Sequence, residues 1–162
     1  MNNKMLKTLT ENRETNAVVG NSVFCDDVWD LSNIIISASM PSSAKKIRFG
    51  DISNTELRML IKDYLYFKLG QVKPQSVIQC RHSLQYLIKF CDMNGLQSLQ
   101  QMSKDMLLEY NLWLREECRL SKRTGYTAMH MVEELIRLGN IKGWPVPSES
   151  ILKGLSSAEI WG

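Results

Sequence analysis

The chain has 162 residues, of which 44% are apolar and 23% are charged, as in an ordinary soluble globular protein. This length accommodates one domain with a hydrophobic core and excludes two complete enzyme domains. Apolar runs such as Ile34 to Ile36 are far shorter than the roughly 18 residues of a membrane span, and the N-terminus lacks the apolar stretch of a secretory signal. We therefore expect a cytoplasmic protein with no membrane partner.

The net charge of +3 arises in the middle of the chain. Residues 1–52 carry six basic and six acidic side chains, residues 53–145 carry thirteen and nine, and residues 146–162 carry one and two. A basic middle segment suits a nucleic-acid or acidic partner. The cysteines and histidines have no zinc-ligand spacing, so we expect no metal and no other cofactor.

The first third of the chain lacks helical periodicity. Residues 1–22 are polar and rich in Asn and Thr, which predicts a disordered tail. Residues 23–52 contain short apolar clusters separated by Pro41 and serines, which predict an extended arm or short strand that packs on the domain behind it.

Residues 53–145 predict four helices, each with apolar side chains at helical spacing on one face. The first begins at a capping box formed by Ser53 and Glu56, and the second begins near Pro74. The third begins after Ser103 and the fourth at Ser121 or Lys122. The expected fold is all-α, a bundle of four to five helices with an extended N-terminal arm.

The end of the chain is predicted to be a linker. Pro145 and Pro147 prevent a continuing helix. Residues 146–162 are expected to hold a short helical turn with nothing to pack on, at the boundary of a domain.

The outer faces of the second and fourth helices are rich in cationic and hydrogen-bonding side chains. Cations and helix N-terminal amides can contact phosphates, while Gln, Arg and Tyr can reach base edges or sugars. The alternative is an ordinary solvated surface, because Glu133 and Glu134 dilute the fourth-helix face. The candidate DNA contacts are Lys73, Gln75, Ser76, Gln79, His82, Tyr86 and Lys89 on the second helix and Lys122, Arg123, Thr124, Tyr126, His130 and Arg137 on the fourth.

No catalytic arrangement is visible in the sequence. The chain has no Gly-rich phosphate loop, no H-E-x-x-H and no G-x-S-x-G. Neither histidine has sequence neighbours that mark a general base. A basic run of Lys45, Lys46 and Arg48 can touch a phosphate backbone, with simple solvation as the alternative.

Four stretches occur in an order that resembles a known family. Val28-Trp29-Asp30-Leu31 and residues 47–52 precede the first helix, Ser76–Cys80 opens the spaced Leu and Phe pattern of the second, and residues 120–124 lead into the last. This order, over about residues 23–147, is similar to the N-terminal core-binding domain of tyrosine recombinases, the phage integrase family. Cys80 departs from the pattern, because tyrosine is frequent there, and a phosphate contact from that position is in doubt.

The resemblance implies a SAM-like orthogonal bundle that grips one face of the recombination-site duplex. It also implies a separate catalytic domain, absent from this chain, that carries the nucleophilic tyrosine. No catalytic residue is assigned here, since the tyrosines at positions 64, 66, 86, 110 and 126 all precede the linker.

Two functions are therefore expected as alternatives. The first is binding of double-stranded DNA, without cutting it, by the core-binding domain of an integrase or transposase of a mobile element. Its partners in the full-length complex would be other recombinase protomers, while the chain alone would be monomeric. The second is a helical protein-protein interaction module without a nucleic-acid role.

Overall fold

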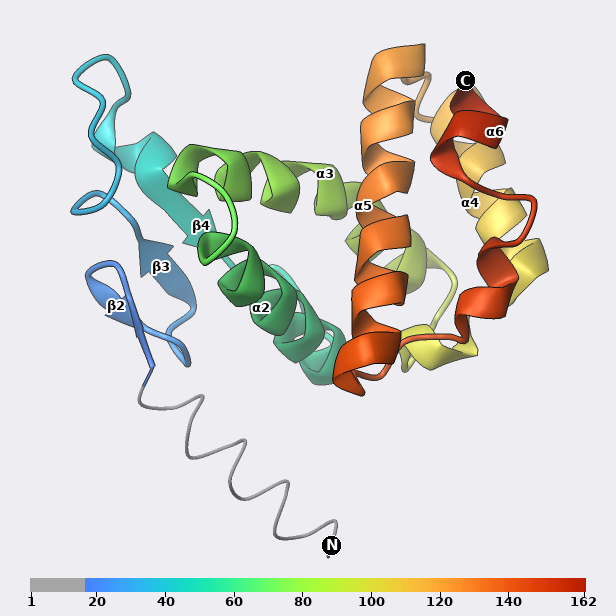
Figure 1. The fold of residues 1–162 in the computed structure, drawn as a ribbon, viewed down its shortest axis with the longest axis horizontal. Helices are drawn as coiled ribbons and strands as arrows, with labels where there is room; N and C mark the ends of the chain where they lie inside the picture. The colour runs from blue at the N-terminus through green and yellow to red at the C-terminus, as the bar shows by residue number, and fades with distance from the viewer. Residues whose placement is uncertain (1–16) are drawn as a thin grey trace, which may run out of the picture.

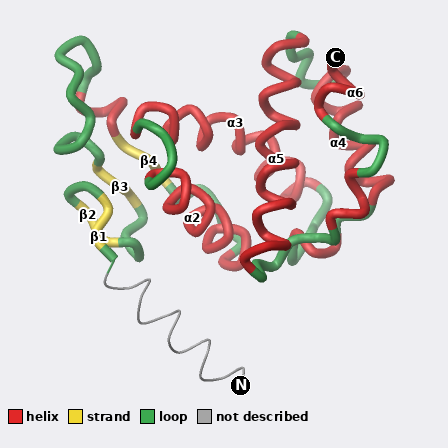
Figure 2. The backbone as a smooth tube through the Cα atoms, in the orientation of Figure 1, coloured by secondary structure: helices red, strands yellow, loops and turns green. Residues whose placement is uncertain are grey.

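The computed structural model describes residues 17–162, so most of the expected tail over residues 1–22 lies outside the described range. The fold is mostly helical, as expected, but two small strand pairs mean that it is not purely all-α (Figure 2). The α-helices are α2 (Thr55–Leu69), α3 (Pro74–Met93), α4 (Lys104–Glu116), α5 (Lys122–Lys142) and α6 (Ser157–Trp161). Short 3-10 helices are η1 (Ser42–Lys45), η2 (Leu99–Gln101) and η3 (Glu149–Leu152).

The arm consists of two antiparallel strand pairs at the side of the helices (Figure 1). Strand β1 (Val18–Val19) pairs with β2 (Ser22–Val23), and β3 (Val28–Asp30) pairs with β4 (Lys46–Arg48). The expected boundary after residue 22 therefore moves toward the N-terminus, because β1 already belongs to a hairpin and Val19 is buried. Strands of two or three residues are too short to show alternation in the sequence.

The arm is anchored on α2 by aromatic packing and by one buried cation. Trp29 and Phe49 are fully buried with their rings edge to face, 4.7 Å between centroids. The Lys62 ammonium group of α2 donates to the carbonyls of Phe24 and Asp26 at 2.9 and 2.8 Å. Burial lowers the pKa of Lys62, and the nearby charge of Asp27 opposes this lowering. The arm is therefore part of the folded domain.

The first helix begins one residue later than the expected capping box. Asn54 is the N-cap, and its Oδ1 accepts from the Leu57 N–H at 2.9 Å. The Asn54 amide also donates to the Gln97 carbonyl at 2.9 Å. Glu56, expected to reach back to the cap, instead accepts a hydrogen bond from Ser98. Contacts with residues 42 and 43 positions away in the sequence thus replace the local Ser53 capping box.

The other three predicted helices begin where the sequence places them. Pro74 opens α3, and the side chains of Ser103 and Ser121 cap α4 and α5. Gly143 ends α5 in the left-handed conformation, with φ of 74°. Helix α3 packs across α5, and α2 packs against α3 (Figure 1).

The C-terminal segment is packed, contrary to the expected linker with nothing to pack on. Helices η3 and α6 lie along α5 (Figure 1). The buried Glu133 carboxylate accepts from the Ser157 N–H and hydroxyl, both at 3.0 Å. The Trp161 indole N–H donates to Asn111 Oδ1 of α4 at 2.8 Å. A single buried carboxylate and one tryptophan therefore hold the last helix on the bundle.

Candidate nucleic-acid interface

The N-terminal turn of α5 is the most positive of the predicted contact regions. The Ser121 side chain accepts from the Thr124 N–H and fixes the start of the helix. Lys122, Arg123 and Thr124 are exposed, and no acidic residue lies in this first turn. The partial positive charge of the helix start adds to that of the side chains. An anion approaching this turn meets only cationic or neutral groups of α5.

Helix α3 begins in the same way, whereas the other α-helices of residues 17–162 do not. Lys73 precedes α3, and its first turn carries no acid. In contrast, α2, α4 and α6 carry Glu56, Asp105 and Glu159 in their first turns. Acidic residues at these positions stabilise a helix. The two helices that lack them are the two that carry the predicted DNA contacts.

Farther along α5, two of the three predicted contacts, His130 and Arg137, lie beside an acidic residue. The rings of Tyr126 and His130 stack at 6.1 Å between centroids and 11° between planes. His130 Nδ1 lies 3.5 Å from the buried Glu133 carboxylate. Arg137 lies 3.9 Å from the same carboxylate and 3.5 Å from Glu149 of η3. Arg137 therefore has acidic partners within the protein. The cations of this row without an acidic neighbour on α5 are in its first turn.

The two glutamates that dilute the α5 face are both compensated. Glu133 is buried under α6. Glu134 accepts from the Tyr64 hydroxyl at 2.8 Å and pairs with Lys68 at 2.7 Å. Burial alone would raise the pKa of Glu134, but the hydrogen bonds from Lys68 and Tyr64 outweigh it, so the pKa is lowered. The negative charge between α5 and α2 is therefore neutralised by a cation of α2.

The predicted contacts on α3 differ in their exposure. Cys80, the position in doubt, is buried near Lys68 and Glu134, and burial raises the pKa of its thiol, so it offers no surface contact. Gln75 and Tyr86 are half-buried. The exposed members of the row are Lys73, Ser76, Gln79, His82 and Lys89.

The two rows lie on crossing helices and not on parallel ones (Figure 1). Lys89 lies close enough to Cys118 for its charge to oppose the rise that burial causes in the pKa of that thiol. Lys73 precedes the first residue of α3, and Arg137 lies in the C-terminal part of α5.

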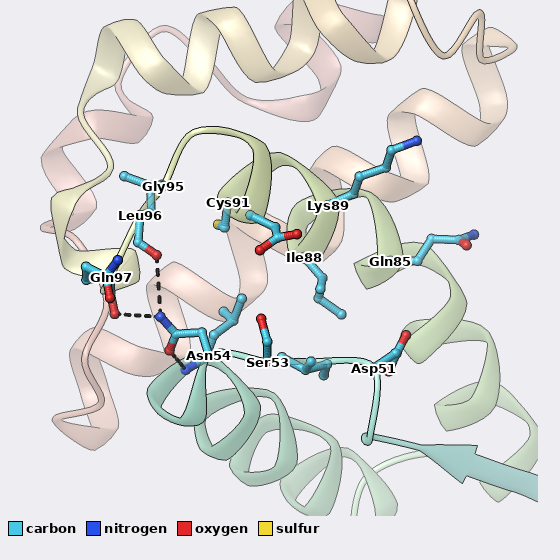
Figure 3. A pocket seen from close by; sticks show the side chains of 13 residues that line it. Asp51, Ser53, Asn54, Gln85, Ile88, Lys89, Cys91, Gly95, Leu96 and Gln97 are labelled. Atoms are coloured by element: carbon cyan, nitrogen blue, oxygen red, sulfur yellow. Dashed lines mark hydrogen bonds between the residues drawn. The ribbon is translucent and has the colours of Figure 1, made fainter.

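One flank of α3 faces the arm across two adjoining pockets. One, of about 510 Å³, lies between the C-terminal half of α3 and the segment before α2 (Figure 3). Asn54 closes its end through the hydrogen bonds to Leu96 and Gln97 that Figure 3 marks, and Lys89 extends from α3 at its rim. The second, of about 490 Å³, lies between β4 and the N-terminal half of α3. Asp51 and Gln85 line both pockets, so together they form one furrow beside α3.

Comparison of the chain with protein-family models, with curated proteins and with solved structures finds no match. Within residues 17–162, no helix combines the length and the apolar character needed to cross a bilayer. Over the same range, no three His, Cys, Asp or Glu side chains gather where they could hold a metal ion.

The sequence marked Lys45, Lys46 and Arg48 as a basic run that can touch a phosphate backbone, but it did not place this run beside the contact rows. Lys46 and Arg48 of β4 line the second pocket opposite Gln79 and His82 of α3. The available signal was the Lys46-Ile47-Arg48 alternation, because a buried residue in a strand leaves its two neighbours on the opposite face. The position of this strand beside α3 has no local signature.

Proposed function

We propose that the chain binds double-stranded DNA, in the manner of the core-binding domain of a tyrosine recombinase, with the first turn of α5 and the outer face of α3 on the phosphate backbone. The supporting observation is the distribution of charge at the helix starts. Only α3 and α5, among the α-helices of residues 17–162, begin without an acid, and both begin with lysine or arginine at or next to the cap. The crossing of α3 and α5 supports a SAM-like orthogonal bundle.

Each part of this surface has a distinct role in the proposal. Lys122 and Arg123 neutralise phosphates, and the backbone N–H groups at the start of α5, apart from that of Thr124, which Ser121 caps, add further donors. The stacked Tyr126 and His130 rings present polar edges next to them, suited to sugar or base contacts. On α3, the exposed side chains of Gln79 and His82 are also suited to sugar or base contacts. The proposed activity is binding, and a separate catalytic domain would perform strand exchange.

Fluorescence anisotropy with a labelled duplex, repeated at several salt concentrations, tests the proposal. The double variant Lys122→Glu, Arg123→Glu should bind at least tenfold more weakly, and its salt dependence should fall by about one to two counterions. The control is Lys104→Glu, Lys153→Glu, which makes the same charge change at exposed positions outside the rows. Equal affinity and equal salt dependence of the two double variants would refute the proposal.

A protein-protein interaction module remains the second candidate, because two observations favour it. Arg137 and His130 lie beside an acid, so two of the three predicted contacts beyond the first turn of α5 have an acidic partner within the protein. Leu108 and Leu112, one turn apart on α4, are 41% and 50% exposed. Absence of duplex binding by the unmodified chain at low salt would favour this candidate over DNA binding.

A further inference from the structure

The arm and α3 enclose a pocket that carries more positive than negative charge. Its volume is about 490 Å³, and its floor is apolar, formed by the buried Ile47 and Ile78. Three cations and a single carboxylate line it within the described chain. The charged residues are Lys46, Arg48, Arg81 and Asp51, with His82 at the same wall.

Arg81 and Asp51 hold the pocket together and largely cancel each other. The Arg81 guanidinium group donates from Nη2 to both carboxylate oxygens of Asp51, at 2.9 and 3.1 Å. Its Nε donates to the Arg48 carbonyl at 3.1 Å. The Arg81 side chain is only 12% exposed, so this residue ties β4 to α3 and is not a free cation. It thereby fixes the position of the arm cations relative to α3.

Two arm cations remain for a ligand. Arg48 is exposed and forms no ion pair with any residue from 17 to 162. Lys46 lies opposite Asp30 in the strand pair. Hydrogen bonds from Ser32 are the main reason that the pKa of Asp30 is lowered, and Lys46 contributes only a smaller electrostatic effect. Lys46 forms no ion pair with any residue from 17 to 162, so its ammonium group is available to the pocket that it lines.

We propose that this pocket binds a phosphate group, with Lys46 and Arg48 supplying the charge and Gln79 and His82 of α3 supplying further hydrogen-bond donors. A guanidinium group presents paired donors that match a phosphate. The proposal rests on the proposed function if the phosphate belongs to a DNA backbone that also contacts α3. In that case the arm is part of the DNA-binding surface and extends it beyond the helices. A free phosphate has the same chemistry and is the second possible source.

The experiment has two parts, both with the full chain. Anisotropy with a labelled duplex is measured for Arg48→Glu and for Lys45→Glu, a neighbouring arm lysine that does not line the pocket. Arg48→Glu should weaken binding about fivefold to tenfold and lower the salt dependence by about one counterion, whereas Lys45→Glu should leave the salt dependence unchanged. In parallel, an NMR titration with inorganic phosphate should shift the amides of β4 and of Gln79 and His82, and Arg48→Glu should abolish the shifts.

The outcomes separate the two proposals. Duplex binding that is equally affected by both variants would overturn the pocket while leaving DNA binding in place. Phosphate-induced shifts at β4 without duplex binding by the unmodified chain would establish the pocket, with free phosphate as its ligand, and would overturn the proposed function. Absence of both signals would overturn both. Thermal unfolding of each variant shows whether the fold is retained.

Discussion

The indole ring of Trp161 lies against Gly125, in the space that a side chain at position 125 would occupy. Helix α6 therefore reaches α5 at a point where α5 has no side chain, and the indole N–H continues to Asn111 of α4. Arg115 lies over the same ring, 4.7 Å from its centroid, and donates to the Ile160 carbonyl at 2.7 Å. This contact joins the end of the chain to both α4 and α5.

Gly125→Ala should destabilise the protein by about 1 to 3 kcal/mol, because the added methyl group overlaps the Trp161 ring. In a Trp161→Ala background the sign should reverse, with a gain of about 0.5 to 1 kcal/mol, since alanine is the better helix former. Urea denaturation of the four proteins gives this double-mutant cycle.

The matched control for this cycle is Gly139→Ala. A methyl group at position 139 would lie 2.5 Å from Val146 Cγ2, a comparable overlap at a separate site. Its cost should persist when Trp161 is replaced. If Gly125→Ala costs the same in both backgrounds, the close contact with Trp161 is not what requires glycine at position 125.

Glu133→Ala should release α6 from α5. The substitution leaves the Ser157 N–H without its partner, which should lower the free energy of unfolding by about 1 to 3 kcal/mol. Tryptic cleavage after the exposed Lys153, followed by mass spectrometry, should become faster. Ser157→Ala removes only the hydroxyl bond and should have a smaller effect on both measurements. Unchanged cleavage in Glu133→Ala would mean that the other contacts of α6 suffice.

The parts of the fold that the sequence predicts are those with local causes. Helices α3, α4 and α5 begin at Pro74, Ser103 and Ser121, where a cap or a proline acts within one turn. Exposure of Lys122 and Arg123 follows from the same helical periodicity that buries the opposite face. For these elements the local signal and the tertiary packing agree.

The remaining parts depend on residues that are distant in the sequence. The packing of α6 requires Glu133 to meet Ser157, 24 residues away, and the furrow requires Arg81 to meet Asp51, 30 residues away. Asn54 replaces Ser53 as the cap of α2 for the same reason, since its amide finds the Gln97 carbonyl. Such pairings have no spacing rule, so sequence periodicity could not reveal them.

Lys62→Met should loosen the arm while leaving the helices folded. The methionine keeps the apolar stem over the Phe24 and Phe49 rings but removes the donor to two carbonyls. We expect a loss of about 1 to 3 kcal/mol. Hydrogen exchange should accelerate over residues 17–52 more than in α3 or α5. The control is Lys104→Met at an exposed position of α4; uniform acceleration over the whole chain would contradict local release of the arm.

Acid should remove a stabilising contribution of Glu134. Its pKa lies below the ordinary 4.5, since burial, which raises the pKa, is outweighed by the hydrogen bonds from Lys68 and Tyr64. A carboxyl whose folded pKa is lowered stabilises the fold above its unfolded pKa, and this contribution is lost as pH falls through the folded value. Glu134→Gln should therefore cost about 1 kcal/mol near neutral pH, and the difference from the unmodified chain should shrink below about pH 4.5. Urea denaturation between about pH 7 and pH 3 measures this, with the exposed Glu109→Gln as the control. The opposite result would be a difference in the free energy of unfolding that grows on acidification. It would show that burial of Glu134 outweighs its hydrogen bonds and that Lys68 does not neutralise its charge.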